Sequence, residues 1–420
     1  MGNKFCKSMM VISIIIIPIL FSCAFAQQKQ VESKDAKAYY QLGITQIQRG
    51  DFDQAILYFN KSIEIDPNNP MAYRDRGAAY SAKGKHDLAI SDWTKALEID
   101  PNDRTAYFNR GRTFCIIKQY DRAISDLNKT LEIDPRDADA YNERGIAYFE
   151  KGQYDLGISD FNKVIEINPN NPLAWKNLGY CYYRMKKWPE AIDKLLIARD
   201  MDPWGLGIEE SLDATLNEAF SDLRKWVDDK PLEPMSHYYL SYAHLYKGES
   251  GKALKEINKA IELDSSKALF YKARGNIYYN QKKYNNAVAD YERCGVLEPS
   301  SWACYASFGE ISAYFLGKPK EGLEAVIKAS TINPQVISVQ SKLGTVYFKN
   351  KEFEKAVAAL NKALSLGAKD QGTYFNLAVA YFYLKNYDMA WRCVRVAERT
   401  GSPKAGDLIK KLNQVSKEPK

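Results

Sequence analysis

Apolar residues recur along most of this chain at the spacing of one helix face, in stretches separated by short polar turns. The stretches come in pairs, and the pair repeats every 34 residues, so that segments 38–69, 72–103, 106–137, 140–171 and 174–205 align without a gap. One pair of short helices cannot bury its apolar faces alone, whereas stacked pairs bury a continuous core. The pattern therefore predicts an all-α protein built as a solenoid of antiparallel helix pairs.

Three positions in each 34-residue unit carry a constant residue type. Counting 36–69 as the first unit, position 4 is aromatic, position 8 is Gly and position 32 is Pro. A small residue at position 8, with another at position 20, lets the two helices approach closely, and the proline ends the second helix. The aromatic residues are Tyr39, Tyr73, Tyr107, Tyr141 and Trp175, the glycines are Gly43, Gly77, Gly111, Gly145 and Gly179, and the prolines are Pro67, Pro101, Pro135, Pro169 and Pro203.

This arrangement resembles the tetratricopeptide repeat family, whose pattern is W-x2-L-G-x2-Y…A-x3-F…P. The resemblance implies a right-handed superhelical solenoid. Five units cover 36–205, and five more cover 234–404 as 234–267, 268–301, 302–336, 337–370 and 371–404, which makes about ten repeats. The tail 405–420 is expected to form a polar capping helix.

Residues 206–233 interrupt the series, because the segment is six residues shorter than a unit. We interpret it as a shortened, irregular helical unit that bends the solenoid, with a first helix within 206–216 and a second within 218–231. The alternative is a linker between two separate domains of five repeats.

The N-terminal region predicts export from the cytoplasm. The apolar stretch Met9–Phe21 follows Lys4 and Lys7 and is shorter than the roughly 20 residues that cross a bilayer. We therefore expect a secretory signal peptide at 1–22.

Two processing signals overlap at the end of this stretch. The sequence Leu20-Phe21-Ser22-Cys23 resembles a lipobox, which would place a lipid on Cys23, whereas Ala24-Phe25-Ala26 before Gln27 is typical of an ordinary signal-peptidase site. We expect lipid attachment at Cys23, a polar tether at 23–35, and an outer-membrane lipoprotein facing the periplasm. The alternative is a soluble periplasmic or secreted protein that begins at Gln27.

Charge is distributed unevenly along the chain. Residues 251–420 hold 27 Lys and Arg against 16 Asp and Glu, whereas residues 201–250 hold 4 against 10. A basic C-terminal half could attract an acidic protein or an anionic envelope polymer, although solvated helix faces account for the same charges. Because the chain is exported, we do not expect a nucleic-acid partner.

The histidines and cysteines do not indicate an enzyme. His86, His237 and His244 each stand where sister units have an aromatic residue, and Cys181 and Cys294 stand at small-residue positions. The sequence contains neither a zinc-ligand spacing nor a P-loop or dinucleotide fingerprint, so we expect no catalytic residues, no metal and no cofactor.

Most of the cysteines are too scattered for a disulfide framework, but two of them could form a bridge. Cys294 and Cys304 lie on adjoining predicted helices, both at small-residue positions. A bridge requires Cα atoms within about 7 Å, and an exported protein meets an oxidising compartment. Two free thiols are the alternative.

Charged residues at positions 7 and 23 vary together. Four units have Arg at position 7, and the same four units have Asp at position 23. We predict that each Arg forms a structural ion pair with the Asp of its own unit. The pairs are Arg76 with Asp92, Arg110 with Asp126, Arg144 with Asp160, and Arg274 with Asp290.

The family resemblance implies that the first helices line a concave groove and that ligands contact positions 2, 5, 6, 9, 12 and 13. In the middle of the chain these positions are rich in Tyr, a side chain enriched at interfaces, although packing between units is the alternative explanation. The predicted partner-binding groove comprises Tyr180, Tyr183, Tyr238, Tyr239, Tyr242, Tyr246, Lys272, Asn276 and Tyr279. We expect Tyr239, Tyr242, Lys272 and Asn276 to form one accessible patch for an extended peptide or a short helix.

Some members of the family hold a partner's C-terminal carboxylate in a clamp of Lys, Asn and Arg side chains. Lys272 and Asn276 match the start of that clamp, Ser307 replaces its second Asn, and Ser338 and Lys342 stand at its last two positions. The clamp is incomplete, so this kind of recognition is not expected.

These observations support two hypotheses of different classes. The first is a non-enzymatic protein-interaction scaffold of the bacterial cell envelope that binds a partner protein in the groove. The alternative is a binding module for an envelope polysaccharide or peptidoglycan, in which Tyr rings stack on sugars.

Overall fold

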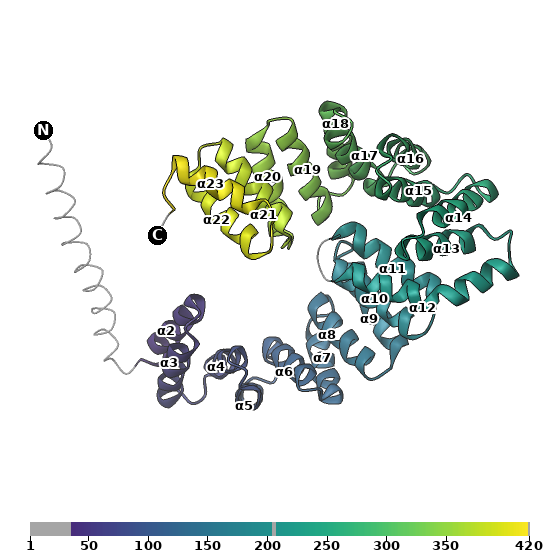
Figure 1. Ribbon diagram of the computed structural model, residues 1–420. Coiled ribbons are helices and arrows are strands. Elements are labelled where there is room, and N and C mark those ends of the chain that lie inside the picture. The colour runs from purple at the N-terminus through teal and green to yellow at the C-terminus, as the bar shows by residue number, and fades with distance from the viewer. Residues whose placement is uncertain (1–34, 204–206, 419–420) are drawn as a thin grey trace, which may run out of the picture. The chain divides into compact units, whose positions relative to one another are not determined.

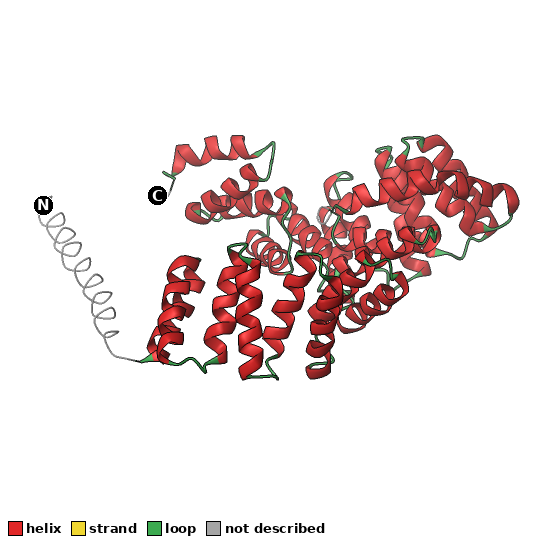
Figure 2. Cartoon of the chain, turned by 90° about the horizontal axis from the view of Figure 1, so that it is seen from below, coloured by secondary structure: helices red, strands yellow, loops and turns green. Residues whose placement is uncertain are grey.

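The computed structural model of the chain describes residues 35–203 and 207–418. Within these residues the secondary structure consists of α-helices joined by short loops, with no strand (Figure 1, Figure 2). The chain divides into two compact units, residues 1–160 and 161–420, and each is described by itself below. The predicted signal peptide at 1–22, Cys23 and the tether up to residue 34 lie outside the described residues.

Most helices form antiparallel pairs, and each pair corresponds to one 34-residue unit of the sequence. The first helices of the pairs are α2 (Ala36–Arg49), α4 (Pro70–Ala82), α6 (Arg104–Ile116), α8 (Ala138–Glu150), α10 (Pro172–Arg184), α13 (Pro234–Tyr246), α15 (Ala268–Asn280), α17 (Trp302–Tyr314), α19 (Ile337–Lys349) and α21 (Gln371–Tyr383). The second helices are α3 (Phe52–Ile65), α5 (His86–Ile99), α7 (Tyr120–Ile133), α9 (Tyr154–Ile167), α11 (Trp188–Met201), α14 (Ser250–Leu263), α16 (Tyr284–Leu297), α18 (Pro319–Ile332), α20 (Phe353–Ser365) and α22 (Tyr387–Arg399). Two helices stand outside the pairs, α12 (Ile208–Asp229) and the last helix, α23 (Ala405–Val415).

Local sequence signals set where the helices begin. Asn69 and Asn171 cap α4 and α10, and each side-chain oxygen accepts hydrogen bonds from two backbone N–H groups of the first turn. Pro70 and Pro172 follow at the first helical position, where a missing N–H costs nothing.

The turn inside each pair requires a left-handed backbone. Glycine supplies it in several units, for example Gly84 with φ of 71°. In other units a lysine adopts the same conformation, as Lys118 does with φ of 59°. The sequence analysis did not single out these lysines.

Glycines at positions 8 and 20 allow close helix contact most clearly in the pair α17–α18. A Cβ atom built on Gly309 would lie 2.5 Å from the carbonyl oxygen of Gly322, and one built on Gly322 would lie 2.4 Å from the carbonyl oxygen of Gly309. Real Cβ atoms do not approach backbone oxygens so closely, so the two backbones fit together only because both residues are glycine.

The four predicted ion pairs are present in the structure. Their closest N···O distances are 2.6 Å for Arg76–Asp92 and 2.7 Å for Arg110–Asp126, Arg144–Asp160 and Arg274–Asp290. In each pair both the Nε and an Nη nitrogen of the guanidinium donate to the carboxylate, and all four carboxylates are buried. This bidentate geometry is the strong form of the Arg–carboxylate interaction.

Each of these arginines also reaches the preceding unit. Arg76 donates to the side-chain oxygen of Asn60 at 2.7 Å, and Arg110 donates to the hydroxyl of Thr94 at 2.9 Å. Arg144 and Arg274 contact Asn128 and Asn258 in the same way. One guanidinium therefore links the two helices of its own unit to the second helix of the unit before it.

The irregular segment differs from its prediction. Instead of a short helix pair, residues 208–229 form one continuous helix of 22 residues, α12. The reason is that the segment contains neither Gly nor Pro between Ile208 and Asp229 to end a helix. Its apolar face, which includes Leu212, Leu216 and Leu223, is buried against α11 and α13 in the second unit, so the segment packs as an element of the solenoid and is not an exposed linker.

Cys294 at the end of α16 and Cys304 at the start of α17 are joined by a disulfide, with Cα atoms 6.2 Å apart. The bond connects the second helix of one unit to the first helix of the next. Cys115, Cys181 and Cys393 do not take part in this disulfide, and the last two are buried. Burial of Cys181 agrees with its interpretation as a small core residue.

Candidate functional site

The centre of the predicted groove is part of the protein core. Tyr238, Tyr239 and Tyr242 are 4%, 3% and 1% exposed. They pack in one apolar cluster with residues of α11, α12 and α14. The Trp226 ring of α12 stacks on Tyr239 at 6.0 Å, and the Tyr239 hydroxyl donates to Asp193 of α11 at 2.9 Å.

The burial of Tyr239 and Tyr242 corrects the prediction of an accessible patch at Tyr239, Tyr242, Lys272 and Asn276, of which only Lys272 and Asn276 are partly exposed. Family positions place these side chains on the groove-facing surface of α13 and α15, but in this chain α11 and α12 cover that surface. Tyr238, Tyr239 and Tyr242 therefore pack between units, which is the alternative explanation given in the sequence analysis.

The remaining polar residues of the predicted groove are bonded within the protein. Tyr246 donates to Glu209 of α12 at 2.5 Å, Asn276 accepts from Tyr291 at 2.5 Å, and Lys272 forms an ion pair of 2.7 Å with Asp200. Burial raises the pKa of Tyr246 above its usual value, since the phenolate would lose its hydration.

Tyr180 and Tyr183 line an open cleft between α10 and α12. The cleft has a volume of about 250 Å³ and is also lined by Gly207, Glu210, Ser211, Ala214 and Thr215. Hydrogen bonds to α12 fix both rings, because Tyr180 and Ser211 share a bond of 2.6 Å and Tyr183 donates to Glu218 at 2.5 Å. This bond to a carboxylate, with burial, raises the pKa of Tyr183. Two of the predicted groove residues thus lie in an accessible, aromatic and acidic cleft.

Tyr279 is the other predicted residue with an accessible ring, since it is 39% exposed. It lies in an aromatic cluster with Tyr284 and Phe315, in which the last two rings stack with centroids 4.2 Å apart. Phe315 is 45% exposed. The cluster presents flat ring faces near the turns that end α15 and α17.

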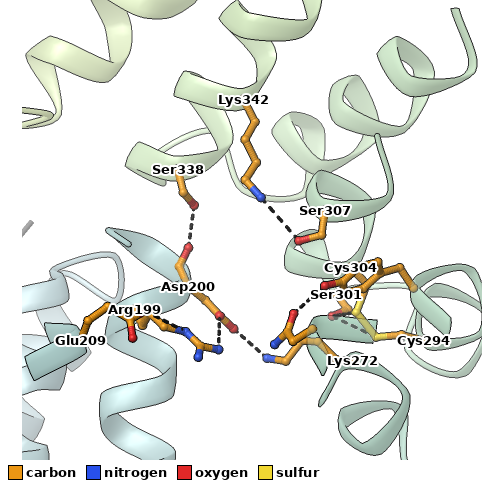
Figure 3. A network of polar contacts seen from close by, with 12 residues as sticks. Arg199, Asp200, Glu209, Lys272, Cys294, Ser301, Cys304, Ser307, Ser338 and Lys342 are labelled. Carbon is orange, nitrogen blue, oxygen red and sulfur yellow. Dashed lines mark hydrogen bonds and ion pairs between the residues drawn. A yellow bond between two sulfur atoms is a disulfide. The ribbon is translucent and has the colours of Figure 1, made fainter. Parts of the chain in front are cut away.

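Two residues at the clamp positions, Lys272 and Ser338, contact Asp200, and two others, Ser307 and Lys342, bond to each other nearby (Figure 3). The Asp200 carboxylate contacts Lys272 at 2.7 Å and Arg199 at 3.3 Å, and its backbone carbonyl accepts from the Ser338 hydroxyl at 2.6 Å. Lys342 pairs with Glu310 at 2.8 Å and donates to Ser307 at 3.5 Å.

Charges in this network support one another. Burial alone would raise the pKa of Asp200, but the Lys272 and Arg199 cations outweigh it, and the pKa is lowered. Burial would likewise lower the pKa of Lys272, but the Asp200 carboxylate reverses this effect, and the pKa is raised. The pair therefore stays ionised at neutral pH.

Two of the three histidines have structural partners, whereas the Nδ1 atom of His86 is buried without a hydrogen-bond partner. His237 contacts Glu256 at 2.6 Å and the Pro231 carbonyl at 3.0 Å, and His244 contacts Glu249 at 2.6 Å. In the part of the chain that the structure describes, no group of three or more His, Cys, Asp or Glu side chains is arranged to hold a metal ion. No helix of this part is both long and apolar enough to cross a membrane.

Sequence reasoning missed the contact between α11 and α19. Asp200 of α11 and Ser338 of α19 are 138 residues apart. Sequence reasoning also missed the hydrogen bond of 2.7 Å between Asn170, before α10, and Asn333, after α18, which are 163 residues apart. The repeat pattern specifies which helices are neighbours in sequence, but it contains no signal for such a distant contact. Only the match of Lys272, Ser338 and Lys342 to clamp positions pointed to this part of the molecule.

Comparison with known proteins identifies the repeat. The family described as tetratricopeptide repeat matches residues 36–69, 70–103, 138–171, 161–193, 227–294 and 337–369, and a TPR repeat model matches 111–152. Together these segments cover more than half of the chain.

Individual relatives are distant and match only part of the chain. The rat peptidyl-prolyl cis-trans isomerase FKBP4 is 28% identical over 155 residues, which are 37% of this chain and 29% of that protein. The TPR repeat-containing protein YpiA of Bacillus subtilis is 23% identical over 192 residues, 44% of this chain and 45% of that protein. The matched region thus spans less than half the length of either relative.

The similarity to solved structures is low over the whole chain. MamA from Desulfovibrio magneticus RS-1 is 25% identical, with a TM-score of 0.39, and the match covers 40% of this chain and 95% of that one. Yeast Tom70 is 15% identical, with a TM-score of 0.41 over 90% of this chain and 95% of that one. The repeat pattern, the paired helices and the family matches together show that the chain belongs to the tetratricopeptide repeat family.

Proposed function

We propose that the chain is a non-enzymatic protein-interaction scaffold of the bacterial cell envelope and that it binds a partner segment in the cleft between α10 and α12. One observation carries the proposal: of the predicted groove, Tyr180 and Tyr183 remain accessible, and they do so in a cleft. Their rings are held by hydrogen bonds to α12, so a partner would meet preorganised aromatic surfaces.

The charge of the cleft favours a basic partner segment. Glu210 lines the cleft and is exposed, and Glu218 lies beside Tyr183. The surrounding residues 201–250 carry 10 acidic against 4 basic side chains. An Arg or Lys of the partner could stack on a Tyr ring while facing these carboxylates.

Site-specific crosslinking tests this function. A photoreactive amino acid at Ala214, an exposed residue that lines the cleft, should crosslink a defined envelope protein in intact cells. Changing Tyr183→Ala should reduce this crosslink about tenfold or more, since truncation of a central aromatic contact costs about 2 kcal/mol.

A matched control distinguishes binding in the cleft from non-specific binding elsewhere on the surface. Tyr383 of α21 is 56% exposed and lies outside the cleft, so Tyr383→Ala should leave the crosslink at Ala214 unchanged. An equal loss in both variants, or a crosslink that does not respond to Tyr183→Ala, would contradict the proposal.

A polysaccharide- or peptidoglycan-binding module is the second candidate. The exposed rings of Tyr279 and Phe315, with Tyr284 stacked on Phe315, favour it, because sugar rings stack on flat aromatic faces. Binding of the purified chain to envelope glycan fragments, lost in Phe315→Ala but kept in Tyr183→Ala, would support this function over the first.

We also propose that Cys23 carries the lipid of an outer-membrane lipoprotein that faces the periplasm. The support is the lipobox-like Leu20-Phe21-Ser22-Cys23 sequence alone, because Cys23 lies outside the described residues. Cys23→Ser should shift the protein from the membrane fraction to the soluble fraction, since stable anchoring needs acyl chains. Unchanged membrane partition would favour the soluble alternative or a protein anchor.

A further inference from the structure

The turns inside the last four helix pairs of the second unit form one continuous edge. Between the first and second of these turns, Phe315 stacks on Tyr284 with ring centroids 4.2 Å apart. Asn350 of the third turn donates to a backbone carbonyl of the second at 2.9 Å. Between the third and fourth, Tyr383 stacks on Phe353 at 4.7 Å. We call this surface the turn edge, and it comprises residues 279–284, 315–320, 348–353 and 382–387.

The turn edge is basic. Its four segments hold seven lysines, all of them exposed, and one acidic residue, Glu352. Within the described part of the chain, one of these lysines, Lys318, forms an ion pair, with Glu321 at 3.1 Å, and the other six form none. Acidic residues follow in the first turns of α18, α20 and α22, so the positive charge is concentrated in the turns themselves.

Three of these lysines adopt a backbone conformation that does not favour lysine. Lys282, Lys351 and Lys385 have φ of 58°, 62° and 58°, whereas other units have glycine at the same turn position, as at Gly84. Among the described residues, every non-glycine residue with positive φ is a lysine in such a turn. Positive φ favours Gly and, among other residues, Asn and Asp. Backbone geometry therefore does not explain lysine at these positions, and the property that lysine adds is its charge.

Flat aromatic rings lie among the lysines. Phe315 and Tyr383 are 45% and 56% exposed, and each ring is held against a ring of the preceding unit. Sugar rings stack on such faces, whereas rings packed flat on a neighbour are not free to insert into a bilayer as the apolar side chains of membrane-binding helices do. The arrangement recurs along the turn edge, so one repeating polymer could contact several turns at once.

We propose that the turn edge binds a linear anionic glycan, whose sugar rings stack on the exposed aromatic faces and whose carboxylates or phosphates face the unpaired lysines. The proposal rests on the second candidate function for the aromatic stacking and adds a requirement for negative charge on the glycan. It does not depend on the cleft between α10 and α12.

Calorimetry with the purified full chain tests the contributions of charge and sugar separately. The probe is a hexamer of β-1,4-linked glucuronic acid. Its neutral control is cellohexaose, which has the same backbone without the carboxylates, and its acidic control is hexaglutamate, which has the same number of side-chain carboxylates without sugar rings. The glucuronate hexamer should bind at least about tenfold more tightly than either control, because ion pairing and stacking act together.

Substitution of the left-handed lysines tests the surface itself. Lys282→Asn combined with Lys351→Asn should weaken binding of the glucuronate hexamer about fivefold or more, because two exposed ion pairs are lost, and Asn tolerates the left-handed conformation. Lys118→Asn combined with Lys186→Asn is the matched control. It makes the same change at two exposed lysines in the same turn position outside the turn edge, and it should leave the affinity unchanged.

The other outcomes identify which part of the proposal is wrong. Equal binding of cellohexaose and the glucuronate hexamer would overturn the requirement for charge and leave the second candidate function standing. Equal binding of hexaglutamate, or of phosphatidylglycerol vesicles with the same dependence on the two lysines, would overturn the glycan in favour of an acidic protein or a membrane surface. Binding of neither glycan would overturn both this proposal and the second candidate function.

Discussion

At the scale of the residue, buried arginine–aspartate pairs recur where the repeat has a polar interior. The Asp126 and Arg110 side chains are 8% and 17% exposed and are joined at 2.7 Å. Burying both charges costs desolvation energy, so the pair is weak evidence for added stability, but removal of one partner leaves the other charge buried without its counter-ion. The covariation of positions 7 and 23 could be detected from the sequence for this reason.

We predict that Asp126→Asn lowers the free energy of unfolding by about 3 kcal/mol, the cost of breaking a buried pair while keeping its shape. Urea denaturation measures the loss. Glu132→Gln on the same helix is the control, because its pair with Lys129 is largely exposed and its removal should not shift the midpoint measurably. Similar losses of unfolding free energy in the two variants would show that the buried Arg110–Asp126 pair contributes no more to stability than the exposed pair.

The free thiols give a second prediction at this scale. Burial raises the pKa of Cys393 to about 11, and burial together with the Glu143 carboxylate raises the pKa of Cys115 to about 12. At pH 8 the thiolate fraction of each is lower than that of an ordinary cysteine by a factor on the order of a hundred or more. Alkylation of the native chain by iodoacetamide should be correspondingly slow, and it should become fast in urea.

Cys294 and Cys304 provide the internal reference in the same experiment. They are joined by the disulfide and should take up iodoacetamide only after reduction. Fast labelling of Cys393 in the native chain, followed by mass spectrometry, would mean that α22 opens readily or that the thiol is not buried in solution.

At the scale of the element, small residues decide how closely the two helices of a pair approach. Regular periodicity let the sequence predict the paired helices, and position 8 let it predict close contact. The periodicity did not predict α12 as one helix, because a template of two helices in 34 residues does not describe this 28-residue segment. No Gly or Pro between Ile208 and Asp229 ends a helix there.

We predict that Gly322→Ala destabilises the chain by about 1–3 kcal/mol, because the new Cβ would lie 2.4 Å from a backbone oxygen that cannot move aside without shifting α17. Gly251 in α14 is the matched control, since a Cβ there meets nothing within 4 Å. Gly251→Ala should stabilise by up to about 1 kcal/mol, through reduced freedom of the unfolded chain. Thermal unfolding of both variants measures the contrast, and loss of stability in both would contradict it.

At the scale of the whole molecule, the sequence specified which helices pack against the next in the chain, but not the contact between α11 and α19. Each unit resembles the next, so contacts between successive helices follow from the repeat itself. Whether α11 meets α19 depends on the sum of many small rotations and on α12, and no single residue encodes that sum. The predicted patch at Tyr242 and Lys272 failed for a different reason: the positions were correct for the family, but α11 and α12 bury Tyr242, and Asp200 of α11 pairs with Lys272.

The contact between α11 and α19 leads to a last prediction, about which helices of the second unit lose stability when one residue is substituted. In an array that contacts only its neighbours, a substitution affects the unit that holds it and the adjacent ones. Because the Ser338 hydroxyl of α19 donates to the backbone carbonyl of Asp200 in α11, Ser338→Ala should lower amide hydrogen-exchange protection in α19 and also in α11, although the two residues are 138 residues apart in the sequence. Glu310→Gln should lower it in α17 and α19 without affecting α11, since its pair with Lys342 does not involve α11. Protection in α11 that does not respond to Ser338→Ala would show that the second unit behaves as a simple array, in which the hydrogen bond between α11 and α19 carries no stability.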